Sequence, residues 1–193
     1  MVGMLSVTAF AVLCVVVLAR AAKAAGNDGR KGDGNALVVY FSASGNTRRV
    51  GEYIAAELNA ETFELTPVHP YTPDDLDYMD KKSRVCREHD DTKLRDVELK
   101  SAVAANWDSY DTVFIGYPIW WGIAAWPMDA FIRANDFSGK TVIPFCTHGG
   151  SGIGRSGELL ARMAGAGNWL RGGDFRSRAR ESDVRKWVKS LSL

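Results

Sequence analysis

The chain has 193 residues, 46% of them hydrophobic and 24% charged, which is the composition of one globular domain with a hydrophobic core and excludes a disordered or collagen-like protein. The formal net charge of +1 gives no electrostatic basis for binding nucleic acid or an anionic membrane surface. The three cysteines, Cys14, Cys86 and Cys146, form no CxxC pair or other metal-ligand spacing, so we expect no zinc or iron–sulfur site.

Residues 1–25 differ from the rest of the chain and predict a signal peptide or a membrane anchor. Met4–Ala19 is almost uninterruptedly apolar, and "AKA" at Ala22–Ala24 is a candidate cleavage site. The run is shorter than the roughly 20 residues that span a bilayer, which favours export. Basic residues follow the run and none precedes it, which favours an anchor through residues 4–19 that leaves the domain in the cytoplasm. A misassigned start codon, and with it a cytoplasmic protein, is the third interpretation.

Residues 26–35 are rich in glycine and charge and predict a flexible linker, so the domain proper is expected over residues 36–193. Apolar runs predict strands at Leu37–Phe41, Glu61–Thr66, Thr112–Tyr117, Thr141–Cys146 and near Asn168–Leu170. Helical patterns lie between and after them, at Thr47–Leu58, Trp126–Ala134, Ser156–Met163 and Ser182–Leu191. This alternation predicts an α/β fold with a doubly wound, five-stranded parallel sheet.

Residues 67–109, which we call the insertion, follow the second predicted strand and are too long for a simple turn. "TPDDL" resembles a helix start, with Asp74 and Asp75 favoured in a first turn by the helix dipole. We predict helices over Asp75–Arg87 and Val97–Ala105. Two roles stay open for the insertion, because it can cover a ligand or simply add surface.

Each of the three strong strands is followed by a loop of the kind that binds ligands. The loops are "SASGNT" at 42–47, "PIWWG" at 118–122 and "THGGSGIG" at 147–154. In a parallel sheet all three emerge at the carboxyl ends of the strands, where doubly wound folds bind their ligands. We therefore expect the three loops to form one site.

The first loop predicts an anion site. Hydroxyl groups at Ser42, Ser44 and Thr47 accompany the backbone N–H groups of a helix start, and Gly45 allows close approach of the backbone. No Gly-Lys-Ser/Thr follows, so a terminal monophosphate fits better than a nucleoside triphosphate. Arg48 and Arg49 lie in the first helical turn, where a nearby anion would offset their unfavourable interaction with the helix dipole.

The other two loops predict a site for a flat ring. Side chains alternate along a strand, so Trp120 and Trp121 cannot both point into the core, and at least one ring is expected to be exposed for stacking. The glycine-rich third loop can lay backbone N–H groups along a polar ring edge, and it contains His148, an idle exposed imidazole or a neighbour of the ring. Its glycines do not form GxGxxG, so no dinucleotide fingerprint is present. A monophosphate, a stacking surface and amide donors together describe flavin mononucleotide, FMN.

The three motifs, "VVYFSASGNT", "FIGYPIWWG" and "VIPFCTHGGSGIG", resemble those of the flavodoxin family, in the same order. The resemblance extends from Ala36 to the C-terminus and is greatest to bacterial flavodoxin-like proteins with a long insertion after the second strand. It implies strand order 2-1-3-4-5, helices on both faces of the sheet, and non-covalently bound FMN. By resemblance, the phosphate would be held by Ser42, Ser44, Gly45, Asn46 and Thr47. The isoalloxazine ring would be flanked by Pro118, Ile119, Trp120, Trp121, Gly122, Thr147, His148, Gly149, Gly150, Ser151 and Gly152.

Three functions remain open. Carrier flavodoxins are typically strongly acidic around the flavin, and this chain departs from them in being nearly neutral. We expect an electron-transfer protein that works with redox partner proteins or a small-molecule acceptor. The alternative is an NAD(P)H-dependent, FMN-containing reductase of quinones or other small acceptors, and a phosphate-binding module without flavin is the third. His148 near the ring's carbonyl edge would favour reduced flavin when protonated.

Overall fold

The computed structural model describes residues 35–193. The predicted signal peptide or anchor and nearly all of the predicted linker therefore lie outside the described residues. Between residues 35 and 193, no helix is long and apolar enough to cross a membrane.

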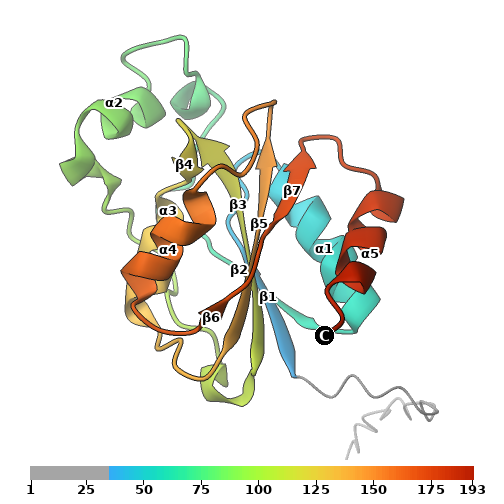
Figure 1. Ribbon diagram of the computed structural model, residues 1–193. Helices are drawn as coiled ribbons and strands as arrows, with labels where there is room; N and C mark the ends of the chain where they lie inside the picture. The colour runs from blue at the N-terminus through green and yellow to red at the C-terminus, as the bar shows by residue number, and fades with distance from the viewer. Residues whose placement is uncertain (1–34) are drawn as a thin grey trace, which may run out of the picture. The chain divides into compact units, whose positions relative to one another are not determined.

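A parallel β-sheet forms the centre of the domain (Figure 1). Its main path is β2-β1-β3-β5-β6, in which the strands are β1 (Ala36–Tyr40), β2 (Glu61–Glu64), β3 (Thr112–Trp120), β5 (Thr141–His148) and β6 (Asn168–Trp169). Two further strands lie off this path. β7 (Gly173–Arg176) pairs in parallel with β5, and β4 (Ile123–Ala124) pairs antiparallel with the end of β3. The predicted fold and strand order are thus confirmed, with β6 and β7 both pairing with β5 where one fifth strand was predicted.

Helices cover both faces of the sheet (Figure 1). α1 (Asn46–Leu58) and α5 (Glu181–Ser190) pack on one face, while α3 (Pro127–Ala134) and α4 (Ser156–Ala164) pack on the other. The bounds of all four helices lie within one residue of those predicted, because a repeating apolar stripe marks each helix in the sequence.

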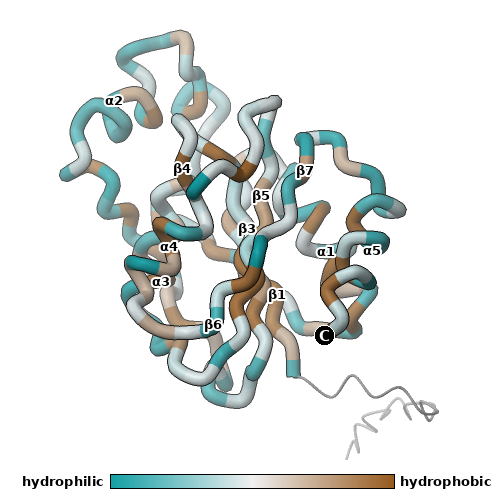
Figure 2. Tube along the Cα trace, viewed as in Figure 1, coloured by the Kyte–Doolittle hydropathy of each residue, from teal (hydrophilic) through white to brown (hydrophobic). Residues whose placement is uncertain are grey.

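The three central strands are buried on both faces. Val38, Phe114 and Ile143 contribute to the core under α1 and α5. Their neighbours Val39, Ile115 and Val142 contribute to the core under α3 and α4, as the alternation of side chains along a strand requires. Figure 2 accordingly shows the hydrophobic residues concentrated along the central strands.

The insertion differs from its prediction. Its α-helix is α2 (Arg84–Asp90), and short 3-10 turns occur at η1 (Asp74–Leu76), η2 (Thr92–Arg95) and η3 (Trp107–Ser109). The helix predicted over 75–87 is wrong in its first half, because the Asp77 and Asp80 side chains accept the N–H groups of Met79 and Lys82 in local turns that compete with a helix.

The second helix predicted in the insertion, over 97–105, is absent from the structure. Leu99 instead pairs antiparallel with Pro67 in an isolated bridge. Two backbone hydrogen bonds flank that bridge, from Val68 to the carbonyl of Glu98 and from Lys100 to the carbonyl of Thr66. Pairing with a distant segment thus replaces local helix formation, as tertiary contacts commonly do for weak helical patterns.

A buried carboxylate fixes the insertion to the rest of the domain. Glu88 of α2 is only 5% exposed, and it accepts hydrogen bonds from the hydroxyl of Tyr71 at 2.6 Å and from Nε1 of Trp126 at 2.7 Å. Arg84 completes the cluster with an ion pair to Glu88 at 2.6 Å, and its guanidinium lies over the Tyr71 ring. Every partner of this carboxylate is therefore a donor held in place by the fold.

We predict that Glu88→Ala lowers the free energy of unfolding by about 3 kcal/mol or more, because it leaves Arg84, Tyr71 and Trp126 without their acceptor. Urea denaturation followed by tryptophan fluorescence measures the change. The matched control is Glu158→Ala, which removes an exposed carboxylate paired with Arg155 and Arg162 and should cost less than about 1 kcal/mol. Equal losses in the two variants would contradict the anchoring role of Glu88.

Candidate functional site

The three loops meet at the carboxyl ends of β1, β3 and β5, which we call the carboxyl edge. β3 pairs in parallel with both β1 and β5, so the three strands end on the same side of the sheet. A direct contact joins the first loop to the third, because the hydroxyls of Thr47 and Thr147 lie 2.7 Å apart and both residues are buried. The structure therefore brings the predicted site residues of these loops together.

The first loop has unsatisfied hydrogen-bonding groups that suit an anion. Gly45 adopts a left-handed conformation at the start of α1, with φ of 80°, and no side chain caps this helix. The first-turn N–H groups of a helix need an outside acceptor, and they carry the positive end of its dipole. The hydroxyl oxygen of Ser42 is buried and has no hydrogen-bond partner among residues 35–193. A phosphate at this loop would satisfy both the hydroxyl and the helix end, so the residues present fit such a group.

The two arginines of the first turn find partners within the protein. Arg48 forms an ion pair with Glu64 at 2.5 Å. Arg49 donates to Oδ1 of Asn46 at 3.2 Å and to the backbone carbonyl of Ser177. A bound anion is therefore not needed to offset the charge of these arginines, because acceptors within the protein already do so. Asn46 in turn donates to the hydroxyl of Ser44 at 3.1 Å, which orders the loop.

The second loop is a tight β-hairpin between β3 and β4. Trp121 and Gly122 form its two-residue turn, with φ of 45° and 81°, as expected for a mirror-image turn that follows the twist of the strands. Glycine adopts this conformation freely, whereas a tryptophan there is strained by about 1 kcal/mol or more. Pro118, Ile119 and Trp120 belong to β3 and are partly buried.

The two tryptophans differ in exposure, as predicted. Trp121 is 45% exposed, and one neighbour of its ring is the imidazole of His89, stacked at a centroid distance of 4.4 Å. Trp120 is half-buried and makes edge contacts with the rings of Phe41, Tyr71 and Trp126, at centroid distances of 4.8 to 5.6 Å. Trp120 thus contributes to packing, and Trp121 offers the more accessible ring.

The insertion contributes side chains to this part of the site. A cavity of about 270 Å³ is lined by Tyr78, Ile119, Trp120 and Trp121. A second cavity, of about 170 Å³, includes Ser42 and Tyr71 in its lining. The insertion therefore does more than add surface, because its side chains line both cavities. Sequence reasoning did not single out Tyr78 or His89, because no local pattern shows which part of a long insertion folds back onto the site.

In the third loop, His148 is held firmly. It ends β5, is 9% exposed, and places Nε2 at 2.5 Å from Oδ1 of Asp174. Its Nδ1 accepts the backbone N–H of Gly152 at 3.1 Å. His148 is thus not an exposed imidazole without partners, and the N–H of Gly152 already donates a hydrogen bond within the protein. The remaining loop residues, Gly149, Gly150 and Ser151, lie between these two anchors.

Asp174 is the partner that the sequence did not reveal, because its strand β7 was not predicted as such. Cys146 of β5 lies beside Asp174 in the pairing of β5 with β7. Burial together with the Asp174 carboxylate raises the pKa of the Cys146 thiol to about 12. The thiol is therefore neutral near pH 7 and offers no activated nucleophile.

Comparisons with known proteins agree with this geometry. The family model described as "Flavodoxin" matches residues 35–191. A structure described as a "putative flavoprotein" from Bacteroides eggerthii DSM 20697 is 39% identical, with a TM-score of 0.74, and the match covers 83% of this chain and 99% of that chain. One from Bacteroides uniformis ATCC 8492 is also 39% identical, with a TM-score of 0.73, covering 81% and 98%. No match is found among curated proteins.

A more distant structure, from Lactobacillus acidophilus NCFM, is described as a flavoprotein in complex with FMN. It is 22% identical over 80% of this chain and 98% of that chain, with a TM-score of 0.57, and so shows the shared fold. The family match and the FMN complex of this structural neighbour support the predicted cofactor, FMN. With nearly the whole described domain matched by the family model and its three loops gathered at one edge of the sheet, the chain belongs to the flavodoxin family.

Proposed function

We propose that the domain binds FMN at the carboxyl edge and transfers electrons through it. The observation that carries this proposal is the unpaired, buried hydroxyl of Ser42 beside the uncapped start of α1. Both groups lack a partner within the described part of the chain, and both suit a phosphate. The aromatic hairpin and the glycine-rich loop lie at the same edge, where the ring of the same ligand can be held.

When bound, FMN supplies the redox chemistry, because it accepts and releases electrons. The residues of the chain bind and orient it and set its electrostatic surroundings. Ser42, Thr47 and the α1 N–H groups would hold the phosphate. Trp121 would contact the ring, while the His148–Asp174 pair fixes the third loop beside it. The exposure of Trp121 leaves this edge accessible to a redox partner.

The phosphate assignment predicts a specific effect of Ser42→Ala. The variant should bind FMN about tenfold or more weakly, because a hydrogen bond to a charged group is lost. The stability of the flavin-free protein should be unchanged or slightly raised, since the hydroxyl has no partner there. Quenching of flavin fluorescence measures affinity, and urea denaturation measures stability. Ser190→Ala, at the end of α5, is the control, and equal FMN affinities of the two variants would contradict the assignment.

Replacement of the two tryptophans by alanine should affect different properties, FMN affinity for Trp121 and stability for Trp120. Trp121→Ala is expected to weaken FMN binding by roughly 1 kcal/mol or more through loss of stacking, with little loss of stability. Trp120→Ala is expected to lower the free energy of unfolding by about 2 kcal/mol, because its ring packs against three others. The same two assays separate the effects. If Trp121→Ala leaves FMN affinity unchanged, the hairpin is not the ring platform.

A reductase of small acceptors is the second candidate function. The observation that favours it is the cavity of about 270 Å³ in which Tyr78 of the insertion faces the tryptophan hairpin. Such an aromatic cavity suits a small flat acceptor beside the flavin. The same flavin would then have to be reduced by NAD(P)H and reoxidised by the acceptor in turn.

Pyridine nucleotides distinguish the two functions. The FMN-loaded protein is mixed anaerobically with NADH or NADPH, and its visible absorbance is followed. An electron-transfer protein should keep its yellow colour until dithionite or a partner reductase is added. Bleaching by pyridine nucleotide alone would replace the proposed carrier with the reductase. A protein that is colourless after incubation with FMN and removal of the unbound flavin would contradict both and leave a phosphate-binding module.

A further inference from the structure

The loop that joins β7 to α5 is basic and lies against the proposed flavin site. Residues 174–180 contain three arginines, Arg176, Arg178 and Arg180, and one acidic residue, Asp174. We call residues 176–180 the arginine loop. In the pairing of β5 with β7, Arg176 lies directly beside His148, which begins the glycine-rich third loop.

Hydrogen bonds fix the arginine loop to the third site loop and to the first turn of α1. The backbone N–H and the hydroxyl of Ser177 both donate to the carbonyl of His148, each at 3.1 Å. The carbonyl of Ser177 accepts a hydrogen bond from the guanidinium of Arg49, in the first turn of α1. The arginine loop is thus held at the carboxyl edge, between the start of α1 and the third loop.

Two of the three arginines keep a free positive charge. Arg180 is engaged by Asp183 in two hydrogen bonds of 3.0 and 3.2 Å, and the only carboxylate of the segment, Asp174, is paired with His148. Arg176 and Arg178 are exposed, and neither makes an ion pair with any residue in the range 35–193. Arg176 and Arg178 therefore place two unpaired cationic side chains at this edge, although the whole chain is nearly neutral.

We propose that the arginine loop is the docking surface for an electron-transfer protein that carries carboxylates around its own redox centre. The inference rests on the proposed function and specifies the partner of that same site. Complementary charge steers two redox proteins together and sets their orientation, and here it would bring the partner beside the flavin. Carrier flavodoxins, being acidic around the flavin, would select partners of the opposite charge.

The exposure of the arginines favours a protein partner over a small anion. Sites for small ligands bury most of the ligand and a few polar groups, whereas Arg176 and Arg178 both lie on the surface. A hollow of about 540 Å³ is lined by the three arginines together with Asp174, Asp183 and Trp187. Acidic side chains projecting from a partner can enter it. A nucleic acid would require a longer basic stripe than this one loop provides.

The test uses the full-length, FMN-loaded chain and two protein probes, an acidic blue-copper protein and a basic c-type cytochrome. After anaerobic photoreduction with EDTA, each reduced flavin passes one electron to each of two acceptor molecules and releases its protons to water. Copper(II) becomes copper(I), or ferric haem becomes ferrous haem. The rates are followed by stopped flow at ionic strengths of about 10 mM and about 100 mM, between which screening shortens from about 30 Å to about 10 Å.

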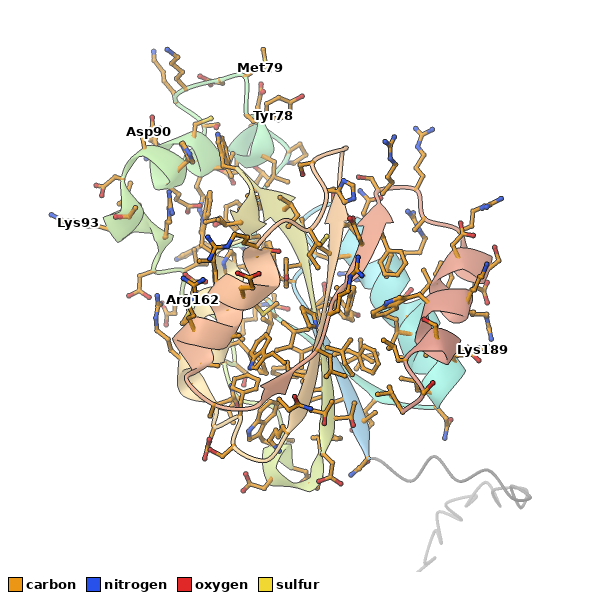
Figure 3. All side chains as sticks on the ribbon, viewed as in Figure 1. Tyr78, Met79, Asp90, Lys93, Arg162 and Lys189 are labelled. Atoms are coloured by element: carbon orange, nitrogen blue, oxygen red, sulfur yellow. The ribbon has the colours of Figure 1, made fainter. Side chains whose placement is uncertain are left out.

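The proposal predicts that the rate with the acidic probe falls about tenfold in Arg176→Glu/Arg178→Glu at the lower ionic strength, and that added salt removes most of the difference. The rate with the basic probe should rise. The control is Arg162→Glu/Lys189→Glu, which makes the same change in net charge on α4 and α5, away from the carboxyl edge (Figure 3). Both control side chains are exposed and form only long ion pairs, at 3.6 and 3.5 Å.

Binding provides a readout that does not depend on the flavin. The full-length chain, with and without FMN, is passed over immobilised acidic probe at the lower ionic strength. Retention should be lost in the arginine-loop variant and kept in the control variant. Equal losses in both, or none in either, would overturn the docking surface whether or not FMN is bound. If retention follows the prediction but the chain takes up no FMN, the proposed function fails while the docking surface stands.

Discussion

The parallel pairing of β3 with both β1 and β5 is the constraint on which the site depends. Because the three strands run in one direction, the loops that follow them must emerge at one edge of the sheet. The backbone pairing fixes the register of the strand ends, and the hydroxyl contact between Thr47 and Thr147 joins the first loop to the third. An anion-binding loop, an aromatic hairpin and a glycine-rich loop thus become one site through the backbone pairing of the strands that precede them.

The insertion adds a second level of organisation. Its carboxylate Glu88 is satisfied by Tyr71 and Arg84 from the insertion and by Trp126 at the start of α3, so the added segment is held close to the tryptophan hairpin. Tyr78 and His89 reach the site through this anchoring. The basic arginine loop lies at the same edge on the side of α5. One edge of the sheet therefore combines a binding site with two surfaces of different chemistry, one aromatic and one cationic.

The fold and the meeting of the three loops at one edge of the sheet could be predicted, because their signals are local. Buried parallel strands are continuous apolar runs, and the helices that cover them show apolar stripes, so both were predicted to within a few residues. The predictions are wrong where contacts outside the local pattern determine the secondary structure. Leu99 pairs with Pro67 in place of a helix, and Asp77 and Asp80 form turns that interrupt another. The short strand β7 carries Asp174 to His148, and no pattern of residues near His148 indicates that partner.

The central claim is that the carboxyl edge binds a flavin through its phosphate. The most direct measurement compares the affinity of the flavin-free protein for FMN and for riboflavin, which has the same ring and lacks the phosphate, by quenching of flavin fluorescence. The account predicts one FMN per chain and at least about a hundredfold weaker binding of riboflavin, as expected when several hydrogen bonds to a charged group are lost. Equal affinities for the two flavins, or no binding of either, would contradict it.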